Sequence, residues 1–128
     1  MKLHELTIHE AHELLKKKEI SSRELSQAVL ARVRETEDRV GAHITVDEEF
    51  TLAQADAADK AISEGRITHL TGIPLGIKDL ICTKGMKTTC GSRFLEDFVP
   101  PYDATVMEKL YSLGAVVSGK LNMDEFAM

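Results

Sequence analysis

Through the first half of the chain, apolar residues are spaced so that they fall on one face of a helix, with polar residues between them. Thr7 and Ser21 each stand three residues before a glutamate, which is the spacing of a capping box at a helix N-terminus. Apolar residues then recur every three or four positions, as on one face of a helix. The elements predicted here are a helix after Thr7, a second from Ser21 to about Asp38, a strand over residues 42–46, and a third helix from Asp47 to Gly65.

The second half consists of apolar stretches separated by glycine and proline. Residues 75–81 are nearly all apolar, which is typical of a strand covered on both faces, and residues 83–92 predict a loop. Strands that alternate with helices favour an α/β fold with some parallel pairing. The remaining predicted elements are a helix capped by Asp103 and ended by Gly114, a strand over residues 115–118, and a last helix from Asn122 or Asp124.

The length and the net charge of the chain limit the classes of protein to which it can belong. The chain has 128 residues, enough for one domain, with a helical part at 1–65 and an α/β part at 66–128. The net charge is −5, and the excess of acidic residues lies entirely within residues 1–65. An acidic chain argues against direct binding to a nucleic-acid backbone. No apolar run approaches the length of a membrane span or of a secretory signal, so a cytoplasmic location is expected.

Two candidate ligand sites, a phosphate loop and a pair of cysteines, lack the residues or the spacing that such sites require. Residues 114–120 fit the G-x-x-x-x-G-K pattern of a phosphate loop, but Leu121 stands where Ser or Thr must reach Mg²⁺. The residues between the two glycines are also typical of a strand. Cys82 and Cys90 lack the spacing of a zinc site, so we expect two reduced thiols, no metal and no cofactor in this chain.

Lys78 is the candidate catalytic residue, because apolar residues flank this lysine on both sides. Asp79 follows it directly, so in an extended strand the two side chains point to opposite faces and Asp79 cannot simply neutralise the lysine. A buried amine is more easily deprotonated, since its charged form loses hydration, and it could then accept a proton. The alternative is a lysine at an edge, whose amine extends into solvent.

The residues around Lys78 resemble the lysine motif of the amidase signature family, which residues 72–79 match. The resemblance continues through residues 85–92, 100–106 and 119–128, and so covers essentially the whole chain. It implies an α/β/α sandwich, of which this chain is an incomplete part, and a Ser–cis-Ser–Lys triad with Lys78 as the catalytic lysine. Both serines lie further along the family chain, so we expect a truncated, inactive N-terminal portion.

The N-terminal helices and residues 119–128 are similar to members that act as the glutaminase subunit of a tRNA-dependent amidotransferase. The resemblance implies that glutamine is hydrolysed to release ammonia. A partner subunit with ATP and Mg²⁺ would then use this ammonia to convert Glu-tRNA(Gln) to Gln-tRNA(Gln), so that tRNA is contacted through the complex. Two alternatives remain open: another amidase-signature hydrolase acting on small amides, and an inactive truncated product or half of a split protein.

Overall fold

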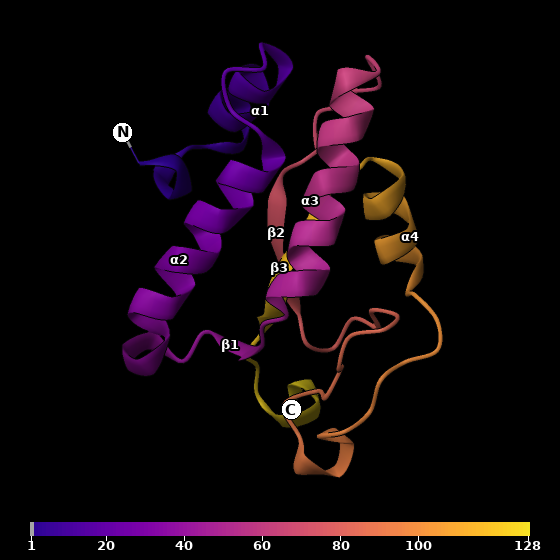
Figure 1. Cartoon of the computed structure of the whole chain (residues 1–128). Helices are drawn as coiled ribbons and strands as arrows, with labels where there is room; N and C mark the ends of the chain where they lie inside the picture. Colours follow the sequence, from indigo (N-terminus) through magenta and orange to yellow (C-terminus); the bar gives the residue numbers. More distant parts are fainter. Residues whose placement is uncertain (1) are drawn as a thin grey trace.

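The computed structural model describes residues 2–128, which form four α-helices, a small sheet and a long loop region (Figure 1). The predicted α/β class is therefore confirmed. The α-helices are α1 (Ile8–Lys16), α2 (Ser22–Val40), α3 (Glu48–Ser63) and α4 (Thr105–Ser112); the strands are β1 (His43–Thr45), β2 (Pro74–Lys78) and β3 (Val116–Leu121); the 3-10 turns are η1 (Leu3–Glu5), η2 (Arg93–Leu95) and η3 (Glu125–Ala127).

Both predicted capping boxes are present. The Thr7 hydroxyl accepts a hydrogen bond from the Glu10 amide at the start of α1, and the Glu10 carboxylate accepts one from the Thr7 amide. Ser21 and Glu24 repeat this arrangement at the start of α2. These bonds satisfy amide groups that have no partner within the helix, which is why the helices begin where the spacing predicts.

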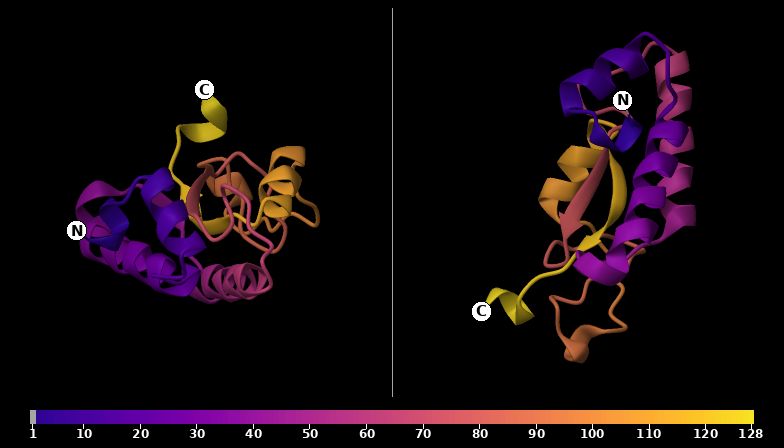
Figure 2. Two further views of the ribbon diagram at one scale, coloured as in Figure 1. Left: turned by 90° about the horizontal axis from the view of Figure 1, so that it is seen from above. Right: turned by 90° about the vertical axis from the view of Figure 1, so that its left-hand side faces the viewer.

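The sheet combines one parallel and one antiparallel pairing. Its strand order is β1-β3-β2, with β2 parallel to β3 and β1 antiparallel to it. Figure 2 shows α2 and α3 along the same side of the sheet. Two α3 side chains bond the backbone of Val117 in β3: Thr51 donates to its carbonyl at 2.7 Å, and the Gln54 carbonyl accepts from its amide at 3.0 Å. The helix thus supplies partners to a stretch of β3 where the sheet is irregular.

Three expectations about the second half are wrong. The strand predicted over residues 75–81 ends at Lys78 and is not covered on both faces, because Gly76 and Lys78 are exposed. Asp103 does not cap α4: the N-cap residue is Ala104, while the Asp103 carboxylate accepts a hydrogen bond from the Lys84 amide in the facing loop. The last predicted helix is only the short 3-10 turn η3.

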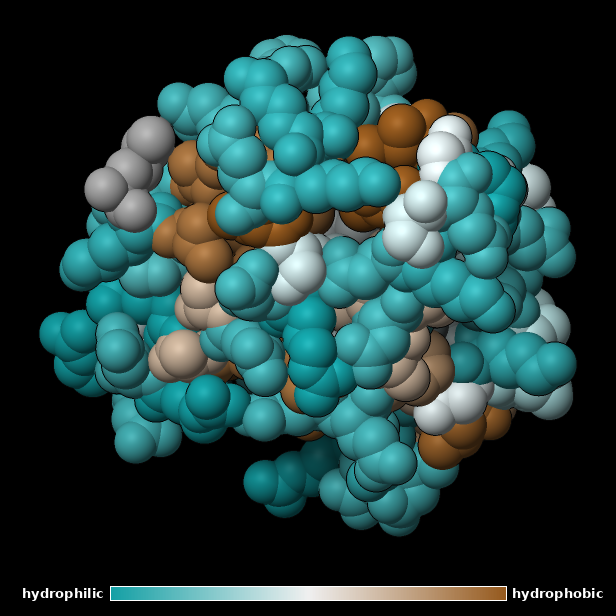
Figure 3. All heavy atoms as spheres, turned by 45° about the horizontal axis from the view of Figure 1, so that its top comes forward, coloured by the Kyte–Doolittle hydropathy of each residue, from teal (hydrophilic) through white to brown (hydrophobic). Residues whose placement is uncertain are grey.

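The buried apolar residues form separate clusters on the sheet and its helices. One lies between α1, α2 and the start of β2, and includes Leu15 and Ile73; another lies between α4 and the strands, and includes Met107 and Val117. The surface in Figure 3 is mostly hydrophilic, with hydrophobic atoms in separate patches. None of the helices in residues 2–128 combines the length and apolar character needed to cross a bilayer.

Candidate functional site at the end of β2

Lys78 is the last residue of β2, and its side chain is exposed. The expectation that apolar neighbours would bury it is therefore wrong. β2 lies at the edge of the sheet, so it has a single strand neighbour, β3, in which Leu121 is the partner of Lys78. Two residues earlier, Gly76 leaves room for Leu121: a Cβ atom there would lie 2.9 Å from Leu121 Cδ2. The lysine amine is thus accessible on one face of β2.

Asp79 occupies the opposite face, as the alternation of a strand predicts. Its side chain is completely buried, and one carboxylate oxygen accepts hydrogen bonds from the amide and the hydroxyl of Thr89. The other oxygen lies 3.4 Å from Lys120 Nζ. The carboxylate nearest to Lys78 in the sequence is therefore engaged by groups on the other face.

Lys120 is the buried lysine of this site, and sequence reasoning missed it. Its side chain is fully buried, and burial lowers the pKa of its ammonium group, while the Asp79 carboxylate acts in the opposite direction. Its neighbours in sequence form β3, which confirms the prediction of a strand in place of a phosphate loop. A signal was available, since a buried Asp79 requires a cationic or hydrogen-bonding partner and Lys120 stands in the other apolar strand.

The Lys120 ammonium group joins β3 to the loop that follows β2. It donates to the Ile81 carbonyl at 3.0 Å, to the Thr88 hydroxyl at 2.8 Å and to the Lys87 carbonyl at 3.5 Å. The predicted loop over residues 83–92 thus folds back over the buried end of β3. Its shape depends on a charged side chain, because a lysine ammonium can donate three hydrogen bonds at once.

The far end of this loop carries Cys90 and Ser92, two further polar residues of the stretch 85–92 that resembles the amidase signature. Cys90 adopts a left-handed backbone with φ of +53°, and its amide donates to the Asp79 carbonyl at 3.0 Å. The Ser92 hydroxyl lies 2.7 Å from Glu125 Oε1, so its partner is a carboxylate of η3. Cys82 and Cys90 are both free thiols, as predicted.

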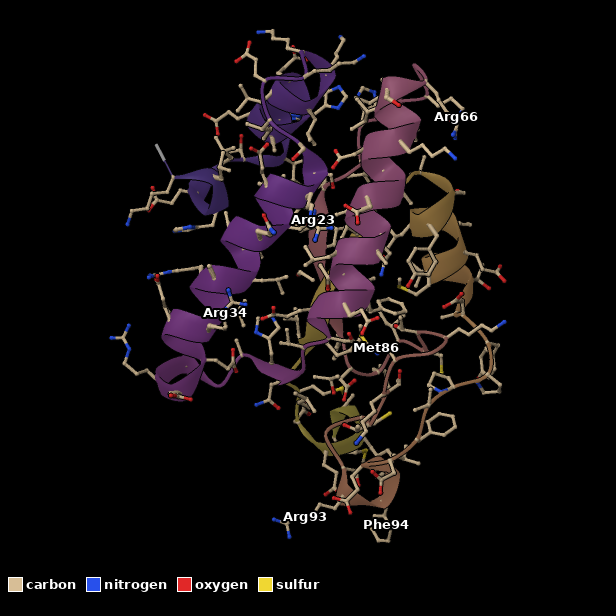
Figure 4. The ribbon with its side chains drawn as sticks, in the orientation of Figure 1. Arg23, Arg34, Arg66, Met86, Arg93 and Phe94 are labelled. Atoms are coloured by element: carbon tan, nitrogen blue, oxygen red, sulfur yellow. The ribbon has the colours of Figure 1, made fainter. Side chains whose placement is uncertain are left out.

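Several hollows lie on the surface of the described residues, and Lys78 does not line five of the most pronounced ones, which include the two nearest to the loop and to α3. A cavity of about 280 Å³ opens between β1 and the loop, where Thr89, Ser92 and Arg93 are among the lining residues. A larger one of about 530 Å³ lies between α3 and α4. Figure 4 shows Arg93 and Phe94 projecting outward from η2, whereas Met86 lies inside, below α3. The candidate site therefore consists of the exposed Lys78 and the buried Asp79–Lys120 pair on the other face of the sheet.

The sequence profile of the Amidase family matches residues 24–128, which include all of β2, the loop and β3. The chain belongs to the amidase family. The match covers Lys78, Asp79 and Lys120, so the exposed lysine and the buried pair both lie within the family's domain.

Similar proteins from several bacteria carry the name of one amidotransferase component. The A subunit of the glutamyl-tRNA(Gln) amidotransferase of Desulfosudis oleivorans is 59% identical over 128 residues, which are all of this chain and 26% of that protein. The A subunit of the Geobacter sulfurreducens enzyme is 54% identical over 128 residues, again all of this chain and 26% of that protein. The chain thus spans about a quarter of the length of these relatives.

Solved structures of amidases have the same fold. The native peptide amidase of Stenotrophomonas maltophilia superposes with a TM-score of 0.90 at 33% identity, covering 95% of this chain and 26% of that one. An amidase family protein of Bacillus anthracis gives a TM-score of 0.88 at 27% identity, covering 96% of this chain and 25% of that one. The predicted amidase-signature fold is confirmed by these similarities.

Proposed function

We propose that this chain contributes the catalytic lysine of a glutaminase subunit in a glutamyl-tRNA(Gln) amidotransferase. The observation that carries the proposal is the 59% identity to the A subunit of such an enzyme over every residue of the chain. The exposed position of Lys78 at the end of β2 supports it, because a group that exchanges protons with a substrate-bound residue must be accessible.

In the proposed reaction, the Lys78 amine accepts a proton that is relayed from the nucleophilic serine through the bridging serine. The serine oxygen attacks the side-chain amide carbon of glutamine, the C–N bond breaks, and ammonia leaves with a proton returned along the relay. Water then hydrolyses the resulting ester and releases glutamate. We propose that both serines come from outside residues 1–128.

The remaining components belong to the proposed complex. Subunits B and C would be the partners in a cytoplasmic heterotrimer, and ATP and Mg²⁺ would bind to a partner subunit. That partner would use ammonia to convert Glu-tRNA(Gln) to Gln-tRNA(Gln). The acidic character of this chain supports contact with tRNA through the complex, since a basic surface is needed for direct contact with its phosphates.

A chimera tests the role of Lys78 in a complete enzyme. Residues 1–128 replace the matching segment of the A subunit of the Desulfosudis oleivorans enzyme, which is expressed with its partner subunits. We expect Lys78→Ala to lower glutamine-dependent Gln-tRNA formation by about 10²–10⁴-fold, the usual cost of losing a general base. Free ammonium bypasses glutamine hydrolysis, so ammonium-dependent formation should persist.

Lys84→Ala is the matched control, because Lys84 is also an exposed lysine and lies in the loop after β2. It should leave both activities unchanged. Near-normal use of glutamine by Lys78→Ala would contradict the catalytic role of this lysine. A chimera that assembles but hydrolyses no glutamine would contradict the proposed function of the segment.

A second candidate is an amidase that hydrolyses other small amides. The similarity to the Stenotrophomonas maltophilia peptide amidase favours it, although the identity of 33% is well below the 59% to the amidotransferase relative. Lys78 would have the same role in such an enzyme. A chimera that accepts peptide amides but not glutamine would support this candidate, and an assembled chimera without any amidase activity would support an inactive product.

A further inference from the structure

Asp79 and Lys120 form a completely buried ion pair directly behind Lys78. Both side chains are 0% exposed, and the carboxylate oxygen and the ammonium nitrogen are 3.4 Å apart. Burying two charges costs free energy that their mutual attraction repays only in part, and apolar residues of similar size are often as stable. Stability alone therefore does not account for a charged pair at this position.

The pair determines the backbone path on both sides of Lys78. In the chain, Asp79 is the next residue, and its amide donates to the Leu121 carbonyl at 3.1 Å while its carbonyl accepts from the Cys90 amide at 3.0 Å. Its carboxylate is bound by Thr89 and Lys120. Asp79 is thus held through its amide, its carbonyl and its side chain, and the end of β2 cannot rotate without breaking these contacts.

The pairing register explains why the two lysines have different environments. Lys120 is the partner of Ile77, and Leu121 is the partner of Lys78, so Lys120 and Lys78 point to opposite faces of adjacent strands. Within residues 2–128, Lys78 forms no ion pair, and Asp79 is held on the far face by Lys120. A carboxylate beside Lys78 would form an ion pair with the amine and draw it away from the proposed proton relay.

We propose that Lys120 is a positioning residue for Lys78: it holds Asp79 and the loop over residues 81–90 on the far face of β2, so that the Lys78 amine stays on the open face without a carboxylate partner. This inference rests on the proposed function of Lys78. Lys120 itself does not contact the substrate, since its ammonium group is enclosed by Asp79, Ile81 and Thr88.

The test uses the chimera with its partner subunits and the variant Lys120→Met, which keeps the length of the side chain but removes its charge. We expect kcat for glutamine hydrolysis to fall about 10- to 100-fold, with KM and ammonium-dependent Gln-tRNA formation within about threefold of the unsubstituted chimera. The double variant Asp79→Asn, Lys120→Met has no carboxylate to release, so it should recover most of the lost kcat.

Leu15→Ala is the control for general loss of stability, because Leu15 is fully buried in the cluster between α1 and α2. It should lower the thermal midpoint and leave kcat unchanged. If Lys120→Met alone does not assemble, the double variant decides, since it leaves no unpaired buried charge: a kcat near that of the unsubstituted chimera supports the inference.

Two results would overturn the inference. One is a folded Lys120→Met chimera with unchanged kcat; the other is a folded double variant that has lost as much kcat as the single one. Lys78→Ala, measured beside them, separates this inference from the proposed function. If Lys78→Ala retains glutaminase activity, the proposed function fails; if it loses this activity while folded Lys120→Met does not, only the positioning role fails.

Discussion

At the scale of single residues, Gly91 occupies a position that a larger residue cannot fill without displacing its neighbours. Its φ of +66° is left-handed, and a Cβ atom would lie 2.6 Å from the Met123 carbonyl oxygen. We expect Gly91→Ala to lower the free energy of unfolding by about 1–2 kcal/mol for the backbone conformation. The contact with Met123 should add about 1–3 kcal/mol, as in overpacked sites.

Gly41→Ala separates these two costs. Gly41 also has a left-handed backbone, with φ of +61°, but a Cβ atom there would meet no other side chain or backbone segment within 4 Å, so only the conformational cost applies. Urea unfolding of both variants of the 128-residue chain gives the comparison. Equal losses for the two glycines would show that the segment around Met123 moves away freely.

At the scale of elements, the start of α2 depends on a carboxylate. Hydrogen bonds from the Ser21 amide, and then from its hydroxyl, lower the pKa of Glu24 below its usual 4.5. A carboxyl group whose pKa is depressed in the folded state stabilises the fold above its unfolded pKa, and this stabilisation is lost as the pH falls through the folded value. We therefore expect Glu24→Gln to destabilise the chain at pH 7 and to make no difference at a pH well below the folded pKa.

Urea unfolding at pH 7 and in acid measures this difference, and Glu13→Gln, which changes an exposed glutamate of α1, is the control. Ser21→Ala removes the other half of the capping box and should cost about 1 kcal/mol at pH 7. A Glu24→Gln chain whose deficit is the same at both pH values would show that the charge of Glu24 does not contribute to the cap.

At the scale of the whole molecule, a single member of the proposed triad lies in these 128 residues. The proposed role of Lys78 as a base requires a positioned nucleophile, and the buried Ser92 hydroxyl is bonded to Glu125. We expect the purified chain to release no ammonia from glutamine above a protein-free blank. The full-length Desulfosudis oleivorans enzyme is the positive control. Glutamine hydrolysis by the 128-residue chain that disappears in Lys78→Ala would contradict this prediction.

Local signals in the sequence were sufficient for the helices of the first half. Thr7 with Glu10 and Ser21 with Glu24 form hydrogen bonds between residues three apart, so the information needed to start α1 and α2 lies within one helical turn. The same holds for the opposite directions of Lys78 and Asp79, which follow from the geometry of any strand. The family resemblance of residues 72–79 likewise needed no structure.

The tertiary structure alone decided which lysine is buried. Both Lys78 and Lys120 stand in apolar stretches, and local pattern cannot distinguish them. Exposure depends on what packs over a strand: β2 is an edge strand whose end stays open at Lys78, whereas the loop over residues 81–90 folds over Lys120 in β3. Asp79 pairs with a residue 41 positions away for the same reason, since the partner of a buried charge is set by the contacts between distant segments.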